Sequence, residues 1–154
     1  MLFGNVCAMY NDLVKSAIRV FLALVILTAA CPAFGQISIV VSKTSPHKPT
    51  EADLKNFFSG TKFSWENGAT VMILDQSSLK MTDQFYKNFL GQTTRKMRKI
   101  WTRLVLSGQA KAPHKCKDTP EVKKMLGENP NAVGFIYTSE LDDSLVELVR
   151  VEFK

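Results

Sequence analysis

Short runs of apolar and β-branched residues alternate with segments of helical spacing along residues 36–154. The runs at 37–41, 69–74 and 132–137 are compact and apolar, which is typical of buried strands. A last strand is expected within residues 144–153. The pattern therefore predicts at least four strands spread along the whole segment.

Capping residues mark the expected helices between these strands. Thr50, followed three residues later by Asp53, predicts a helix start, and Gly60 is a natural stop for that helix. Helical spacing returns over 81–91 and again over 94–106. The apolar positions of the second of these helices form one stripe, made of Met97, Ile100, Trp101, Leu104 and Val105.

The final third of the chain follows the same alternation. Residues 108–117 form a basic loop without periodicity. Thr119 is the expected N-cap of another helix, with Pro120 at its first position and an end near Gly127. Strands separated by helices predict an α/β domain with helices packed on a sheet.

Two loops are the expected places for a binding site. Ligand sites in α/β sheets favour the loops beyond the strand ends. The loops that follow the first two strands are residues 42–49 and 75–80. The second carries several hydroxyl and amide side chains.

Residues 1–35 have the pattern of a signal peptide. Lys15 and Arg19 precede the apolar run 20–27, which is shorter than the roughly 20 residues of a comfortable bilayer span. Small residues at Ala33 and Gly35 predict cleavage before Gln36. The expected organisation is a signal peptide at 1–35 and one α/β domain at 36–154, which leaves no membrane span after cleavage.

Other interpretations of the leader remain open. The apolar run would also serve as an uncleaved membrane anchor. Thr28-Ala29-Ala30-Cys31 loosely resembles a lipobox, so anchoring through a lipid on Cys31 is a second alternative. The start codon is Met1 or Met9, since a start at Met9 shortens a long n-region.

The expected mature chain is basic. Without residues 1–35 it keeps 18 Lys and Arg against 13 Asp and Glu, a net charge of +5. Ten basic residues gather in one region (Arg95, Lys96, Arg98, Lys99, Arg103, Lys111, Lys115, Lys117, Lys123 and Lys124). Such a region attracts phosphate, nucleic acid or anionic lipid, or is simply a solvated helix face. No nucleic-acid-binding motif is present, and export disfavours that partner.

The residues offer little for catalysis or metal binding. His47 and His114 both lie in expected loops, and no Ser or Cys motif surrounds them. His114 and Cys116 are two potential ligands where a zinc site usually needs three or four. We therefore expect a non-enzyme without cofactor or metal. Cys116 is the one cysteine after residue 35, so it is a buried small residue, a free thiol or an intermolecular bridge.

Four segments in order resemble one known family. Residues 54–60, with Trp65 and Gly68 behind them, look like the "IF-x-G-K…W-x-x-G" segment of phosphate-type periplasmic substrate-binding proteins. Residues 85–91 resemble the helix after the phosphate loop of those proteins. Residues 101–108 are similar to the "W-x-R-x-x-F-x-G" stretch of short, single-lobe relatives, and 129–136 to "N-P-G-A-I-G-Y-V".

The resemblance implies a fold, a ligand and a location. The fold would be a single lobe of a type-2 periplasmic binding protein, with a mixed sheet flanked by helices. The ligand would be inorganic phosphate or a related oxyanion, bound in the periplasm. By position, Ser77, Ser78 and Thr82 would supply hydroxyl donors and Lys80 a cation. Helix N-termini and hydroxyls favour such anions.

The expected role is a solute-binding module linked to an ABC-type phosphate transporter or to a sensor. Its protein partner would then be the transporter permease or an envelope sensor protein. The alternative is an envelope protein-interaction module that keeps the lobe fold and has lost the ligand. That module would act through a surface, such as the basic one.

Overall fold

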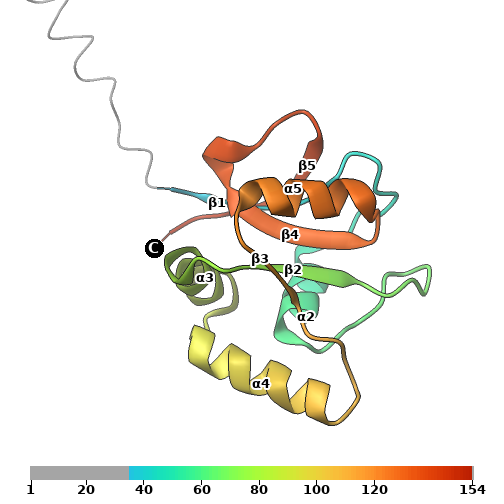
Figure 1. Cartoon of the computed structure of the whole chain (residues 1–154), viewed down its shortest axis with the longest axis vertical. Helices are drawn as coiled ribbons and strands as arrows, with labels where there is room; N and C mark the ends of the chain where they lie inside the picture. Colours follow the sequence, from blue (N-terminus) through green and yellow to red (C-terminus); the bar gives the residue numbers. More distant parts are fainter. Residues whose placement is uncertain (1–34, 154) are drawn as a thin grey trace, which may run out of the picture. The chain divides into compact units, whose positions relative to one another are not determined.

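The computed structural model describes residues 35–153, which contain a mixed five-stranded sheet (Figure 1). The strands are β1 (Ile37–Ser42), β2 (Met72–Gln76), β3 (His114–Cys116), β4 (Ala132–Tyr137) and β5 (Leu145–Val151). Their order is β3-β2-β4-β1-β5. β2 runs parallel to β3 and β4, whereas β1 is antiparallel to β4 and β5. The predicted α/β class with a mixed sheet is confirmed.

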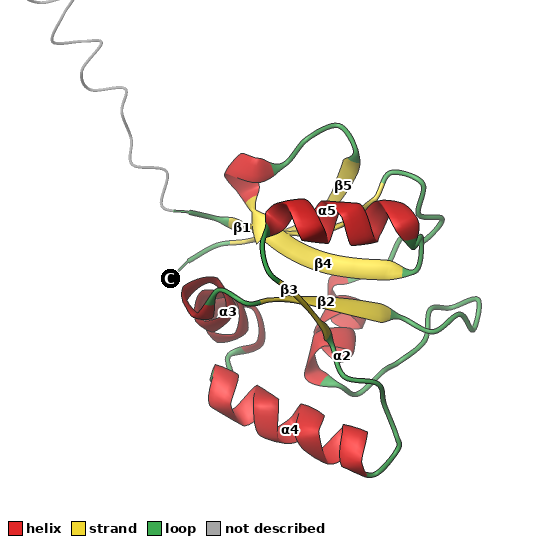
Figure 2. Ribbon diagram, in the orientation of Figure 1, coloured by secondary structure: helices red, strands yellow, loops and turns green. Residues whose placement is uncertain are grey.

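Helices cover both faces of this sheet (Figure 2). α5 (Thr119–Glu128) packs on one face. The other face carries α2 (Glu51–Ser59), α3 (Leu79–Phe85) and α4 (Thr94–Leu106). A π-helical turn, η1 (Tyr86–Leu90), continues α3, and a 3-10 turn, η2 (Thr138–Glu140), follows β4.

The ends of α2 lie where the sequence predicts them. The Thr50 side chain accepts a hydrogen bond from the Asp53 backbone, and the Asp53 carboxylate accepts one from the Thr50 backbone. Gly60 then ends the helix with a φ of 76°, a left-handed conformation that suits glycine. Lys62 pairs with Asp53, and its hydrogen bond together with those from Thr50 lowers the pKa of Asp53 to about 2.

Aromatic side chains fill the core between the sheet and the three helices. Phe85 stacks on Phe135 of β4 with ring centroids 4.0 Å apart, and Phe58 of α2 meets Phe85 edge-on. Trp101 of α4 is 7% exposed and donates its indole N–H to the Phe58 carbonyl at 3.3 Å. Trp65 is also buried, so both tryptophans belong to the core.

Three predicted element boundaries are wrong. Pairing between distant strands explains two of them, and an N-cap one residue earlier in the chain explains the third. β2 begins at Met72 and continues through Gln76, so the expected loop 75–80 starts two residues later. Part of the expected loop 108–117 forms β3, which pairs with β2 in parallel. Asp118, not Thr119, caps α5, because its side chain accepts from the Glu121 backbone at 3.0 Å.

The leader predictions fall outside the described residues. The signal peptide at 1–35, the lipid-anchored alternative at Cys31 and the two start codons therefore stay predictions. No helix within residues 35–153 is long and apolar enough to span a bilayer.

Candidate functional site

The carboxyl ends of β2 and β3 meet at one edge of the sheet, because these strands are parallel neighbours. Beyond that edge lies the short connection from β2 to α3. It consists of Ser77 and Ser78, both exposed, and α3 begins directly after them at Leu79. This connection is the part of the predicted anion loop that faces solvent.

The two serines have different backbone roles. Ser78 is the N-cap of α3, and its hydroxyl accepts from the Met81 backbone N–H at 3.5 Å, a long hydrogen bond. The backbone N–H of Ser77 donates to the Cys116 carbonyl at 2.8 Å, which ties the connection to the end of β3. The Ser77 side chain stays exposed.

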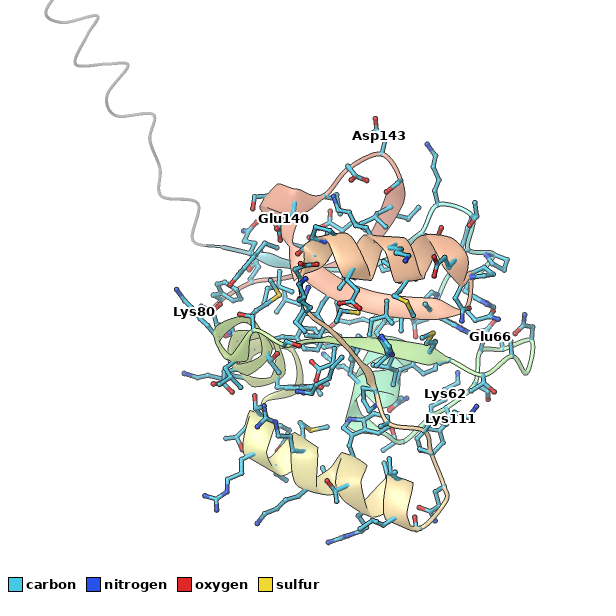
Figure 3. The ribbon with its side chains drawn as sticks, viewed as in Figure 1. Lys62, Glu66, Lys80, Lys111, Glu140 and Asp143 are labelled. Carbon is cyan, nitrogen blue, oxygen red and sulfur yellow. The ribbon has the colours of Figure 1, made fainter. Side chains whose placement is uncertain are left out.

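The other two predicted residues lie on opposite sides of α3. Lys80 is exposed, and Figure 3 shows its side chain pointing away from the ribbon. Thr82 is 2% exposed, and its hydroxyl donates to the Gln76 carbonyl at 2.9 Å. Ser77, Ser78 and Lys80 thus lie together at the surface. Thr82 lies beneath them, and its hydroxyl proton is donated to the Gln76 carbonyl.

Asp75 and Gln76, which the sequence pattern placed in the loop, are buried strand residues. Gln76 donates its side-chain amide to the Phe135 carbonyl at 3.1 Å. Asp75 is 7% exposed, and within residues 35–153 its carboxylate accepts a hydrogen bond from the Gln76 backbone N–H alone, at 2.9 Å. Burial raises the pKa of Asp75, although the charges of Lys115 and Arg98 oppose that rise.

Asp75 lines a cavity of about 380 Å³ that sequence reasoning missed. The cavity lies between α4 and the β2–β3 edge, with Tyr86, Arg98 and Lys115 as its other ionisable residues. Burial and the nearby Asp75 raise the pKa of the Tyr86 hydroxyl. The sequence does place an acid, Asp75, at the end of an apolar run. It gives no sign of the cavity, because Arg98 and Lys115 come from segments that are distant in the sequence.

The exposed side of α4 is basic and partly apolar. Its residues Arg95, Lys99 and Arg103 belong to none of the ion pairs formed within residues 35–153. Leu106 is 82% exposed, and Leu79 of α3, across a shallow hollow, is 60% exposed. The basic residues of α4 are thus exposed, as both interpretations of the basic region require.

One residue of the predicted apolar stripe does not reach the core. Met97 and Trp101 are buried and Ile100 and Leu104 partly so, but Val105 is 39% exposed. The prediction for Val105 is wrong because no element covers that side of α4. Val105 lines the cavity that contains Asp75 instead.

Cys116 is buried and forms no disulfide within residues 35–153. Burial and the nearby Glu121 raise its pKa to about 11, so the thiol stays protonated at neutral pH. Of the three roles left open for it, that of a buried, inert side chain is confirmed. Among the described residues, no three His, Cys, Asp or Glu side chains lie together as metal ligands would.

Comparisons with known proteins identify structural neighbours only. No family model matches the sequence, and no curated protein matches it. A Clostridium perfringens protein described as a phosphate ABC transporter substrate-binding protein, solved with bound phosphate, matches with a TM-score of 0.57 and 18% identity. That match covers 74% of this chain and 44% of the neighbour.

Two further neighbours carry related descriptions. An ABC-type phosphate transport receptor from Vibrio cholerae matches with a TM-score of 0.55 and 16% identity, over 74% of this chain and 45% of that one. PstS from Borrelia burgdorferi matches with a TM-score of 0.51 and 16% identity, over 68% and 41%. These neighbours are binding proteins, and this chain spans less than half of each. The described residues therefore have the fold of about half of a phosphate ABC transporter substrate-binding protein, which confirms the resemblance and the single-lobe architecture.

Proposed function

We propose that this protein is a periplasmic solute-binding module for phosphate or a related oxyanion. The observation that carries the proposal is the connection from β2 to α3, where two exposed serines meet a helix start. Hydroxyl groups and free backbone N–H groups at a helix start are suitable donors for an oxyanion. The neighbour with bound phosphate has the same fold, which supports the choice of ligand.

Each predicted site residue has a role in this proposal. Ser77 and Ser78 donate hydroxyl hydrogen bonds to the anion, and Lys80 supplies a positive charge from the first turn of α3. Thr82 does not contact the anion in this proposal. It holds the first turn of α3 against the end of β2, because its hydroxyl donates to the Gln76 carbonyl. The protein acts without catalysis, and it delivers the anion to an ABC transporter permease or an envelope sensor.

Calorimetric titration with phosphate tests this site. Wild-type protein should bind phosphate saturably at moderate salt and prefer it to sulfate. The double variant Ser77→Ala/Ser78→Ala should lose at least tenfold in affinity, because two donors to the anion are removed. Lys99→Ala on α4 is the control, since it removes a positive charge that does not belong to the connection from β2 to α3. Equal affinity in the double variant and the wild type would refute the assignment.

The exposed side of α4 favours a second candidate function, a protein-interaction module. Unpaired cations beside two exposed leucines form a surface that suits an acidic, partly apolar partner. Under this candidate the protein binds no phosphate, and Leu106→Asp abolishes capture of an envelope partner. Phosphate binding that depends on Ser77 and Ser78 would decide for the first function.

A further inference from the structure

The cavity beside α4 contains two buried polar groups with unused hydrogen-bonding capacity. Asp75 and Tyr86 line it, although they are only 7% and 3% exposed. Asp75 forms no ion pair within residues 35–153, and its carboxylate accepts only from the Gln76 backbone. The Tyr86 hydroxyl makes no hydrogen bond in the described part of the chain. A buried carboxylate with one backbone hydrogen bond and no ion pair keeps lone pairs that can accept further hydrogen bonds, so both groups are available to a ligand.

Two cations lie on the same side of the sheet as Asp75. Lys115 of β3 is the direct register partner of Asp75 in β2, so both side chains project from one face of the parallel pair. Arg98 reaches the same cavity from α4. Both charges act on Asp75 through space without contacting it as an ion pair. One carboxylate, that of Asp75, and two cationic side chains, those of Arg98 and Lys115, thus line the same small cavity.

The remaining wall of the cavity is mostly apolar. Apart from Thr102, it consists of Trp101, Val105, Leu106, Ala112 and Pro113. Its volume of about 380 Å³ falls within the size range of small-molecule pockets. A pocket of this kind is matched by a ligand with an apolar body and a few charged groups.

We infer that this cavity binds a small zwitterion, namely a free α-amino acid with an apolar side chain. Its ammonium group meets Asp75, its carboxylate meets Arg98, Lys115 and the Tyr86 hydroxyl, and its side chain packs against Trp101 and Val105. An α-amino acid carries both charges on one carbon, which suits a carboxylate and a lysine on adjacent strands.

Inorganic oxyanions fit this cavity poorly. A dianion would meet the carboxylate of Asp75, and it would leave the apolar wall without a partner. The residues of the cavity are also distinct from Ser77, Ser78, Lys80 and Thr82. The inference therefore stands or falls independently of the proposed oxyanion site.

The test uses three matched ligands on the purified full chain. L-leucine should bind saturably by calorimetry and change tryptophan fluorescence, since Trp101 lines the cavity. N-acetyl-L-leucine lacks the ammonium group and isoamylamine lacks the carboxylate, so each should bind at least tenfold more weakly. Absence of saturable leucine binding, or equal binding of all three, would overturn the inference.

Variants assign the binding to the cavity. Asp75→Asn and Arg98→Gln should each weaken leucine binding at least tenfold, whereas Lys99→Gln, next to Arg98 but outside the cavity, should not. Val105→Trp places a larger side chain in the cavity at a partly exposed position, so the protein should fold and leucine binding should be blocked. This variant therefore tests the cavity independently of how Asp75→Asn folds. Leucine binding that survives Val105→Trp, or is displaced by phosphate at constant ionic strength, contradicts the inference. Ser77→Ala/Ser78→Ala should leave leucine binding intact.

Discussion

The two helices α5 and α4 lie on opposite faces of the same sheet, and they are packed differently. α5 buries Val122 and Leu126 against the sheet, and its lysines pair with acids, Lys123 with Asp142 and Lys124 with Glu128. α4 buries Met97 and Trp101 but leaves Val105 and Leu106 exposed. Its cations Arg95, Lys99 and Arg103 have no acidic partner in the described region.

The difference separates a structural face from a candidate functional face. On the α5 side, apolar groups fill the space and charges are neutralised locally. On the α4 side, a cavity of about 380 Å³ contains an unpaired buried carboxylate. Unsatisfied groups of this kind reduce stability, so their presence points to binding. Three pairs of substitutions test how far this contrast extends.

The largest expected effect is the truncation of an apolar side chain on the α5 face. Leu126 is fully buried, so Leu126→Ala should lower the free energy of unfolding by about 2–5 kcal/mol. Leu106→Ala on α4 should change it by less than about 0.5 kcal/mol, because that side chain is 82% exposed. Urea denaturation of both variants measures the contrast. Similar losses for the two would show that α4 is covered as α5 is.

A smaller effect is expected from adding a methyl group under α5. A Cβ at Gly134 of β4 would lie 3.1 Å from Val122 and 3.2 Å from Leu74, so Gly134→Ala should destabilise by about 1–3 kcal/mol. Gly127, within α5, has open space around it, and Gly127→Ala should stabilise by up to about 1 kcal/mol through helix propensity. Thermal melts followed by circular dichroism compare them. A neutral Gly134→Ala would mean that this face tolerates extra volume.

The smallest expected effect concerns the buried charge on the α4 side. The pKa of Asp75 is raised in the folded state above its ordinary 3.8, so the folded protein holds this proton more tightly than the unfolded chain. The reduction in stability due to Asp75 therefore builds up as the pH rises from about 3.8 to the folded pKa, is complete above the folded pKa, and is absent below about pH 3.8. Asp75→Asn should raise the free energy of unfolding at neutral pH, and the gain should shrink as the pH falls toward 4.

Urea titrations of Asp75→Asn and wild type between pH 4 and 7 measure this gain. Lys99→Gln is the control, since it removes an exposed charge from α4 and should show no such pH dependence. A gain that is constant with pH would mean that Asp75 is not an unpaired buried acid.

Local signals in the sequence predicted most of the fold. The capping box at Thr50, the stop at Gly60 and the apolar runs of β1 and β4 depend on neighbouring residues, and these were placed correctly. The polar loop after the second strand was predicted as a place for a site, and the resemblance to phosphate-type binding proteins assigned Ser77, Ser78, Lys80 and Thr82 to it; that assignment stays a prediction. β3 was missed, because three residues of a basic loop become a strand only through pairing with β2.

The sequence by itself determined the alternation of strands and helices, the ends of α2 and α4 and the basic charge of α4, since each depends on residues a few positions apart. Only the tertiary structure decided that Asp75 is buried without an ion pair in the described region and that Val105 is exposed. Burial depends on which distant segments come together, and here α4 and β3 meet β2 around a cavity that they do not fill. Asp75, Arg98 and Lys115 lie around one site because their three elements meet there, and no local sequence motif brings them together.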